Sequence, residues 1–222
     1  MHEESAGWRR TALASLVICS LGGTLLARGT DGFRALTSEQ ARRQSVARSP
    51  RALPEVLLED QDQRPFTLGD YRGRPIAVDF VYTRCRSICT VANAGFQRLD
   101  VAERSHGHER DGRLALVSIS FDSSDSPDRL REQATHYDAD GRSWRFARLR
   151  DPRQLPALLH AFGVIVIPAP GGDFQHNAAV LLVNTEGQLA RVLDVDAPVD
   201  AVASAVASIS RPSAATSASP VR

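Results

Sequence analysis

Two cysteines in the middle of the chain have the clearest capacity for chemistry. Cys85 and Cys89 stand four positions apart, directly after an apolar stretch. This separation places both sulfur atoms on one side of a helical turn, close enough to share a metal ion or form a disulfide. Cysteines are also common as small buried core residues. Two of only three cysteines within one short loop nevertheless favour a functional pair, and we interpret Cys19 as a bystander.

The elements around the pair are typical of a layered α/β sheet. Residues 76–82 are β-branched and aromatic, which predicts a buried strand that ends just before Cys85. Residues 114–121 predict a second strand, with the nearly continuous apolar core of a sheet covered on both faces. A helix is expected from about 90 to 103. Sites gather at the carboxyl ends of strands in such sheets, and Cys85 lies at such an end.

The remaining pattern continues this alternation. Ser126-Pro127-Asp128 predicts a helix start, and Asp151-Pro152 opens a second helix that stops at Gly163. Further strands are expected at 144–149 and 178–183, the latter paired with 188–193 in a hairpin, before a last helix over 199–209. The order of elements predicts an α/β domain with a central mixed β-sheet flanked by helices.

Composition narrows the class of protein. The 222 residues include 27 Lys+Arg, all of them arginine, against 26 Asp+Glu, for a net charge of +1. This balance argues against a nucleic-acid-binding protein, which needs a basic excess. Three cysteines are too few for a disulfide scaffold. A hydrophobic content of 42% is enough to form a core, so wholesale disorder is excluded.

The chain divides into four expected segments. Residues 1–27 include an uncharged apolar stretch from Thr11 to Ala27, without a clear cleavage site, which favours an uncleaved membrane anchor over a cleaved signal segment. Residues 28–50 are polar and arginine-rich and indicate a flexible linker. Residues 51–210 form the domain, and the Ser/Ala/Pro-rich residues 211–222 are expected to be disordered. We place the domain outside the cytoplasm.

Four segments together resemble the SCO/SenC family of copper-binding proteins, which have a thioredoxin-like fold. The first is the run from Gly73 through the Cys85–Cys89 pair, with three residues between the cysteines. The strand and acidic loop 117–127, the segment 144–164, and the segment 174–184 agree in order and spacing. The similarity covers about residues 52 to 193.

The resemblance implies a copper site formed by Cys85, Cys89 and His176. Two thiolates and an imidazole are a soft donor set that suits Cu(I) and can also hold Cu(II). A histidine after Gly171-Gly172 could equally be a solvated loop residue, but His176 comes just before a buried strand. The implied function is delivery of copper to the binuclear copper site of cytochrome c oxidase, or preparation of its thiols. The resemblance thus implies a copper-site subunit or another thiol client as partner. We expect a monomer anchored to the bacterial inner membrane and facing the periplasm.

Several positions depart from the family pattern. Members commonly have proline directly after each cysteine, where this chain has Arg86 and Thr90, and Gln175 replaces an acidic residue before the histidine. Arg84 and Arg86 would disfavour a cation but stabilise a thiolate.

The strand segment around Asp79, six residues before Cys85, resembles the corresponding segment of thioredoxin itself. In thioredoxin, a buried carboxylate at this spacing serves proton transfer. Such a group would have a raised pKa and could act as a base, or it could be a satisfied strand residue.

Two alternative functions use the same cysteines. A thiol–disulfide oxidoreductase would use Cys85 as nucleophile, Cys89 as resolving thiol and Asp79 as base. The three-residue spacing is longer than the C-x-x-C of dedicated oxidoreductases and argues against it. A peroxide-reducing relative would need a Thr and an Arg around its cysteine, and the arrangement of Thr83 and Arg84 is not convincing. We therefore expect a metal carrier rather than an enzyme.

Overall fold

A computed structural model describes residues 4–29, 38–85, 88–105 and 114–210 of the protein. The chain forms two compact units, residues 1–48 and 49–222. All the residues that we singled out for chemistry belong to the second unit.

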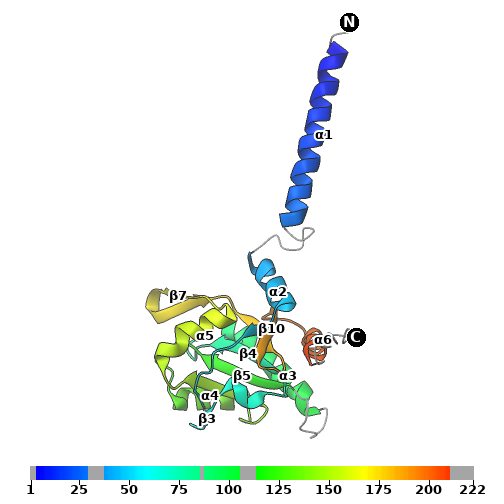
Figure 1. Ribbon diagram of the computed structural model, residues 1–222. Coiled ribbons are helices and arrows are strands. Elements are labelled where there is room, and N and C mark those ends of the chain that lie inside the picture. The colour runs from blue at the N-terminus through cyan, green and yellow to red at the C-terminus, as the bar shows by residue number, and fades with distance from the viewer. Residues whose placement is uncertain (1–3, 30–37, 86–87, 106–113, 211–222) are drawn as a thin grey trace, which may run out of the picture. The chain divides into compact units, whose positions relative to one another are not determined.

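The second unit contains ten strands and four α-helices in its described residues, with short 3-10 turns between them (Figure 1). The strands are β1 (Arg51–Ala52), β2 (Leu58–Asp60), β3 (Pro65–Phe66), β4 (Ile76–Val81), β5 (Ala115–Ser120), β6 (Trp144–Leu149), β7 (Val166–Ala169), β8 (Asp173–His176), β9 (Ala179–Val183) and β10 (Gln188–Asp194). The helices are α3 (Ile88–Ser105), α4 (Pro127–His136), α5 (Leu155–Phe162) and α6 (Val199–Ile209). The 3-10 turns are η1 (Leu68–Tyr71), η2 (Pro152–Gln154) and η3 (Pro170–Gly172).

Eight of these strands form one mixed sheet in the order β1-β10-β9-β4-β5-β6-β2-β3. Strands β4, β5 and β6 are parallel neighbours, and β9 runs antiparallel to β4. The carboxyl ends of β4 and β5 therefore lie side by side at one edge of the sheet. Strands β7 and β8 form a separate two-stranded hairpin, called the β7–β8 hairpin below.

Alternation along β4 assigns the two faces of the sheet. Ala77 belongs to a buried cluster with side chains of α3, α4 and α6, such as Phe96 and Leu130. The ring of Phe80, which points to the opposite face, contacts Phe162 of α5 with 5.2 Å between centroids. Helices thus cover both faces of the sheet, as its continuous apolar strands require. Asp79 shares the face of Ala77 and so points toward the side of α3.

The main elements confirm the predicted α/β layout of a central mixed sheet flanked by helices. Strand β6 has the predicted bounds, and the bounds of β4, β5 and β9 differ from the prediction by only one or two residues. Ser126 caps α4 as expected, with its side chain accepting from the backbone N–H of Arg129 at 3.3 Å. Gly163 ends α5 in the left-handed conformation at φ 67°. The short strands β1, β2 and β3 and the β7–β8 hairpin were not predicted.

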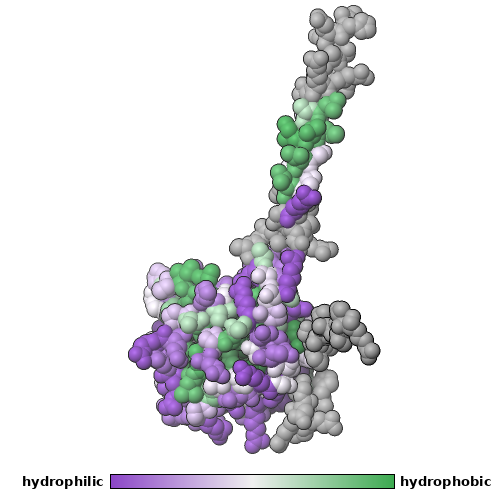
Figure 2. All heavy atoms as spheres, viewed as in Figure 1, coloured by the Kyte–Doolittle hydropathy of each residue, from purple (hydrophilic) through white to green (hydrophobic). Residues whose placement is uncertain are grey.

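The first unit contains two helices, α1 (Glu4–Gly29) and α2 (Ser38–Arg48). Leu16, Ile18 and Leu21 of α1 are all more than 60% exposed, and Figure 2 shows an apolar band along this helix. No helix among the described residues combines the length and apolar character needed to cross a membrane. The expected anchor is therefore not shown as a membrane span.

Helix α2 lies in the segment where we expected a flexible linker without regular structure. Its first turn carries Glu39, which pairs with Arg42 at 2.7 Å and Arg43 at 3.1 Å. Such ion pairs three and four positions apart stabilise a helix that has no apolar stripe. The expected disorder of 211–222 lies outside the described residues.

Candidate metal and thiol site

The cysteine pair lies at the junction of β4 and α3. The backbone N–H of Cys85 donates to the carbonyl oxygen of Tyr82 at 3.2 Å, which closes a turn directly after the strand. Cys89 lies in the first turn of α3, and its backbone N–H donates to the Cys85 sulfur at 3.3 Å. An N–H group at a helix start stabilises negative charge on sulfur. No disulfide joins the two cysteines, so the structure shows the dithiol form.

The two thiols differ in their access to solvent. Cys85 is partly exposed, whereas Cys89 is only 2% exposed. Burial and the neighbouring Cys85 raise the pKa of the Cys89 thiol. Because thiol reactivity follows exposure and thiolate character, Cys85 is the sulfur that an incoming reagent meets.

His176, the last residue of β8, lies beside the buried cysteine. Its Nε2 is 3.7 Å from the Cys89 sulfur. Burial lowers the pKa of His176, which favours the neutral imidazole that binds metals. Its ring packs against Phe121, with 5.1 Å between centroids, and its buried Nδ1 has no hydrogen-bond partner among the described residues. Nε2 is therefore the ring atom that faces the thiols.

The distance between Cys89 and His176 fits a shared metal ion. Thiolate and imidazole ligands hold zinc at about 2.3 and 2.0 Å. An angle of roughly 120° at such an ion separates sulfur from nitrogen by about 3.7 Å, which matches the 3.7 Å observed. No group of three His, Cys, Asp or Glu side chains among the described residues is assembled as a metal site. The Cys85 sulfur interacts with the Cys89 thiol, with the N–H of Cys89 and with the hydroxyl of Tyr82.

Asp79 is a buried carboxylate on the strand that leads to the cysteines. It is 2% exposed, and neither of its oxygens makes a hydrogen bond of normal geometry with a described group. Burial raises its pKa to about 7, an effect that Ser118, opposite it on β5, only partly offsets. Its charge also contributes to the raised pKa of Cys89. Asp79 thus has the environment of a proton-transfer group, and that role stays a prediction.

Two aspartates of the loop after β5 anchor the start of the cysteine loop, a role that we did not predict. Asp125 accepts hydrogen bonds from the backbone N–H of Thr83 at 2.8 Å, from its hydroxyl at 2.5 Å and from Ser120 at 2.6 Å. Asp122 pairs with Arg84 at 2.6 Å. The Arg84 charge that we expected to favour the thiolate is therefore largely offset by Asp122, and Arg86 lies outside the described residues.

The β7–β8 hairpin carries His176 and is attached to the domain at both ends. At its base, the amide of Asn177 donates to the carbonyl oxygen of Gly163 at 3.0 Å and accepts from the N–H of Ile165 at 2.7 Å. At its tip, the hydroxyl of Tyr82 donates to the Asp173 carboxylate. Neither Tyr82 nor Asp173 was singled out by sequence, because nothing in the local pattern indicated a hairpin here.

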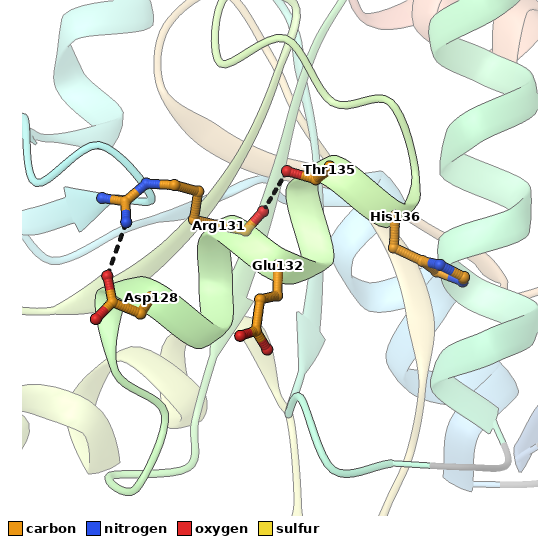
Figure 3. Close-up of a pocket in the computed structure, with 5 residues that line it drawn as sticks. All are labelled: Asp128, Arg131, Glu132, Thr135 and His136. Carbon is orange, nitrogen blue, oxygen red and sulfur yellow. Dashed lines mark hydrogen bonds and ion pairs between the residues drawn. The ribbon is translucent and has the colours of Figure 1, made fainter.

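A hollow of about 490 Å³ on α4 offers no comparable chemistry. Its lining residues Asp128, Arg131, Glu132, Thr135 and His136 all come from one helix (Figure 3). Arg131 pairs with Asp128 at 2.7 Å, and the Thr135 hydroxyl donates to the Arg131 carbonyl oxygen at 2.9 Å. The helix thus satisfies several of these polar groups itself, and the side chains diverge rather than converge on a ligand.

Residues 48–211 match the family model described as SCO1/SenC. The chain belongs to the SCO1/SenC family. It shares 29% identity over 184 residues, 81% of this chain and 85% of the other, with a Stutzerimonas stutzeri protein provisionally named as copper-binding. In this chain three residues separate Cys85 from Cys89, as in the family pattern. The structure adds His176 next to Cys89.

Solved structures of this family share the fold. BsSco, described as a member of the Sco family of cytochrome c oxidase assembly proteins with a disulfide switch, has a TM-score of 0.64 and 22% identity, over 74% of this chain and 96% of its own. Bradyrhizobium japonicum ScoI, solved with copper bound, has a TM-score of 0.56 and 21% identity, over 71% and 99% of the two chains. These similarities confirm the expected Sco-like thioredoxin fold.

Proposed function

We propose that this SCO1/SenC protein binds copper through Cys85, Cys89 and His176 and carries it as cargo. The observation that carries this proposal is the 3.7 Å approach of His176 Nε2 to the Cys89 sulfur. Two thiolates and an imidazole match the preference of Cu(I) for soft donors, and the imidazole extends the set to Cu(II). The Cys85 side chain already interacts with the Cys89 thiol, so the third donor lies beside the pair.

The asymmetry of the two thiols supports transfer by ligand exchange. Cys85 is partly exposed, so its thiol can be the first ligand to exchange with a thiol or metal of a partner. Cys89 is buried and, with His176, would hold the ion on the protein side. Exposed apolar side chains lie on the elements that carry the site: Ile165 (63% exposed) and Ile167 (54%) at β7, and Val91 (42%) on α3. A partner that docks there would exclude water from the exchange.

The proposed client is the copper-site subunit of cytochrome c oxidase, or another protein with a copper or thiol site. Family membership supports this choice, because relatives are described as assembly proteins of this oxidase. We also propose that the exposed apolar surface of α1 associates the protein with the bacterial inner membrane, with the domain in the periplasm. Cargo delivery makes the protein a carrier rather than an enzyme.

Thiol–disulfide exchange is a second candidate function, supported by the pairing of an accessible with a buried thiol. Cys85 would attack a client disulfide, and Cys89 would then attack Cys85 in the mixed disulfide and release the reduced client. Asp79 would accept the Cys89 proton during this second attack. Its burial and its pKa of about 7 suit that exchange near neutral pH.

Anaerobic copper titration of the reduced full-length protein tests the proposed function. We expect one Cu(I) per chain, with Cys85→Ser and Cys89→Ser each abolishing tight binding and Cys19→Ser leaving it intact. Binding of Cu(I) by a Cys85→Ser/Cys89→Ser double variant as tightly as by the wild type would overturn the assignment. Copper-independent reduction of insulin that disappears in Cys85→Ser would favour the oxidoreductase instead.

A further inference from the structure

Tyr82 is the residue that contacts every part of the candidate site. It follows β4, is 3% exposed, and its carbonyl oxygen accepts the N–H of Cys85. Its hydroxyl donates to the Asp173 carboxylate at the tip of the β7–β8 hairpin and lies 3.4 Å from the carbonyl oxygen of Phe174. One side chain thus joins the cysteine loop to the hairpin that carries His176.

The thiols also lie around Tyr82. Its hydroxyl interacts with the Cys85 thiol, and its backbone lies against the Cys89 sulfur. Its ring centroid lies 5.2 Å from that of Phe174 and 6.4 Å from that of His176. The ring fills space around the histidine, whereas only the hydroxyl bonds to the hairpin, so the two contributions can be separated by mutation.

The hairpin needs such an attachment because it is not part of the main sheet. Among the described strands, β7 and β8 pair only with each other. Asn177 fixes the base of the hairpin, and the tip meets the cysteine loop at two points. These are the Tyr82–Asp173 hydrogen bond and the approach of Arg84 to Gly172, where an added Cβ would lie 3.1 Å from Nη1. Without the hydroxyl bond, this end of the hairpin would be held mainly by the ring of Phe174, which packs against Tyr82 and Phe121, and would open more easily.

We propose that Tyr82 is a positioning residue, anchored by Asp173, that holds the histidine arm of the site against the two thiols. The inference deepens the proposed copper function and rests on it for its effect on the metal. Removing the hydroxyl should loosen the hairpin and with it the placement of His176. The Cys85 thiol loses its contact with the hydroxyl, but the backbone of both cysteines, which is held by β4, α3 and Asp125, should keep its position.

Two variants that break the bond, one that preserves it and one matched control elsewhere test this role in the full-length protein. Tyr82→Phe keeps the ring and loses the hydroxyl, and Asp173→Ala loses the acceptor. Asp173→Asn keeps an oxygen that can accept the hydrogen bond and should restore the wild-type properties. Tyr71→Phe, in the 3-10 turn Leu68–Tyr71, removes a phenol hydroxyl from a residue outside the site.

The first measurement is Cu(II) binding, followed by the electron paramagnetic resonance spectrum of bound Cu(II). We expect Tyr82→Phe and Asp173→Ala to raise the Cu(II) Kd about tenfold, the lower end of the typical effect of removing a residue that orients a ligand. Both should change the spectrum, while Asp173→Asn and Tyr71→Phe resemble the wild type. The Tyr82→Phe/Asp173→Ala double variant should bind Cu(II) no more weakly than either single variant, because the two substitutions remove the same hydrogen bond.

The second measurement, amide hydrogen exchange of the copper-free protein, separates this inference from the copper function. Exchange in residues 166–176 should be at least about tenfold faster in Tyr82→Phe and Asp173→Ala, with α3 unchanged, as expected for local opening. If the wild type bound no copper, the proposed function would fail, and exchange alone would decide the role of Tyr82. Wild-type exchange, Kd and spectrum in both single variants would overturn the inference.

Discussion

The Nε2 of His176 lies 3.7 Å from the Sγ of Cys89, although the two residues are 87 positions apart in the chain. The two residues reach this contact from different elements: Cys89 lies in the first turn of a helix that covers the sheet, and His176 ends a strand of the β7–β8 hairpin. Because neither element is built on the other, their meeting depends on the loops that join them to the domain.

Replacing His176 by alanine should weaken the binding of Cu(II) more than the binding of Cu(I). Loss of the imidazole leaves two thiolates, which suit Cu(I) but serve Cu(II) poorly. We expect Cu(II) affinity to fall on the order of 100-fold or more, since even residues behind a ligand are typically worth about 10–100-fold. Cu(I) affinity should fall less. Competition titrations with chelators of known affinity measure both.

His160→Ala is the matched control, because this exposed histidine of α5 has no place in the site. It should leave both affinities unchanged. Wild-type Cu(II) affinity in His176→Ala would remove the histidine from the ligand set.

The two thiols should differ in their rate of alkylation. In a Cys19→Ser background, the reduced protein should react with iodoacetamide at Cys85 at least about tenfold faster than at Cys89, because Cys89 is buried and its thiol pKa is raised. Mass spectrometry of peptides from timed samples measures the two rates. Faster modification of Cys89 would contradict the proposed roles of entry thiol and buried ligand.

Asp79 should make the protein less stable as pH rises toward neutrality. Its pKa is about 7 in the folded state against 3.8 in the unfolded chain, so between these values the folded state holds the extra proton. The free energy of unfolding then falls from about pH 4 to pH 7 and this contribution stays flat above. At about 1.36 kcal/mol per pH unit, Asp79→Asn should gain up to roughly 4 kcal/mol relative to the wild type across this range.

Urea denaturation at several pH values checks this sign. Asp140→Asn is the control of opposite direction, because hydrogen bonds from Arg142 and Ser143 outweigh burial and lower the pKa of Asp140. The Asp140 carboxylate therefore adds to the free energy of unfolding of the wild type above its unfolded pKa, and this contribution is lost as pH falls. A constant difference between Asp79→Asn and the wild type from pH 4 to 8 would show that the Asp79 carboxyl titrates normally.

Asp125 should matter for both stability and the cysteine loop. Asp125→Ala leaves the N–H and hydroxyl of Thr83 and the hydroxyl of Ser120 without their acceptor. We expect the free energy of unfolding to fall by roughly 2–4 kcal/mol, because buried donors without partners are costly. Asp128→Ala, whose carboxylate is 81% exposed, should cost less than about 0.5 kcal/mol. Equal unfolding midpoints for the two variants in urea would show that Asp125 anchors nothing.

The sequence predicted the elements that carry strong periodic signals. Strands such as β4 and β5, with buried residues at every position, and helix α4, with its serine cap and first-turn proline, are local patterns that any window of the chain displays. The cysteine pair was found because its two members are close in sequence. These features need no knowledge of the tertiary fold.

The remaining parts of the site depend on contacts between distant segments. The bond from Tyr82 to Asp173 and that from Thr83 to Asp125 link residues 91 and 42 positions apart. Strands of two to four residues, such as β7 and β8, are too short to show alternation. His176 was therefore found through family resemblance, and the hairpin that presents it was not found at all.

Because the β7–β8 hairpin is separate from the eight-stranded sheet, this part of the site can evolve independently of the sheet. Substitutions or insertions between 166 and 175 do not shift the register of any strand in the main sheet, because none of those strands pairs with the hairpin. The proposed donor His176 can thus be re-aimed, exchanged or lost while the cysteines and the core stay intact. If the protein carries copper as proposed, evolution or a protein engineer can vary the preferred oxidation state of that copper without rebuilding the fold.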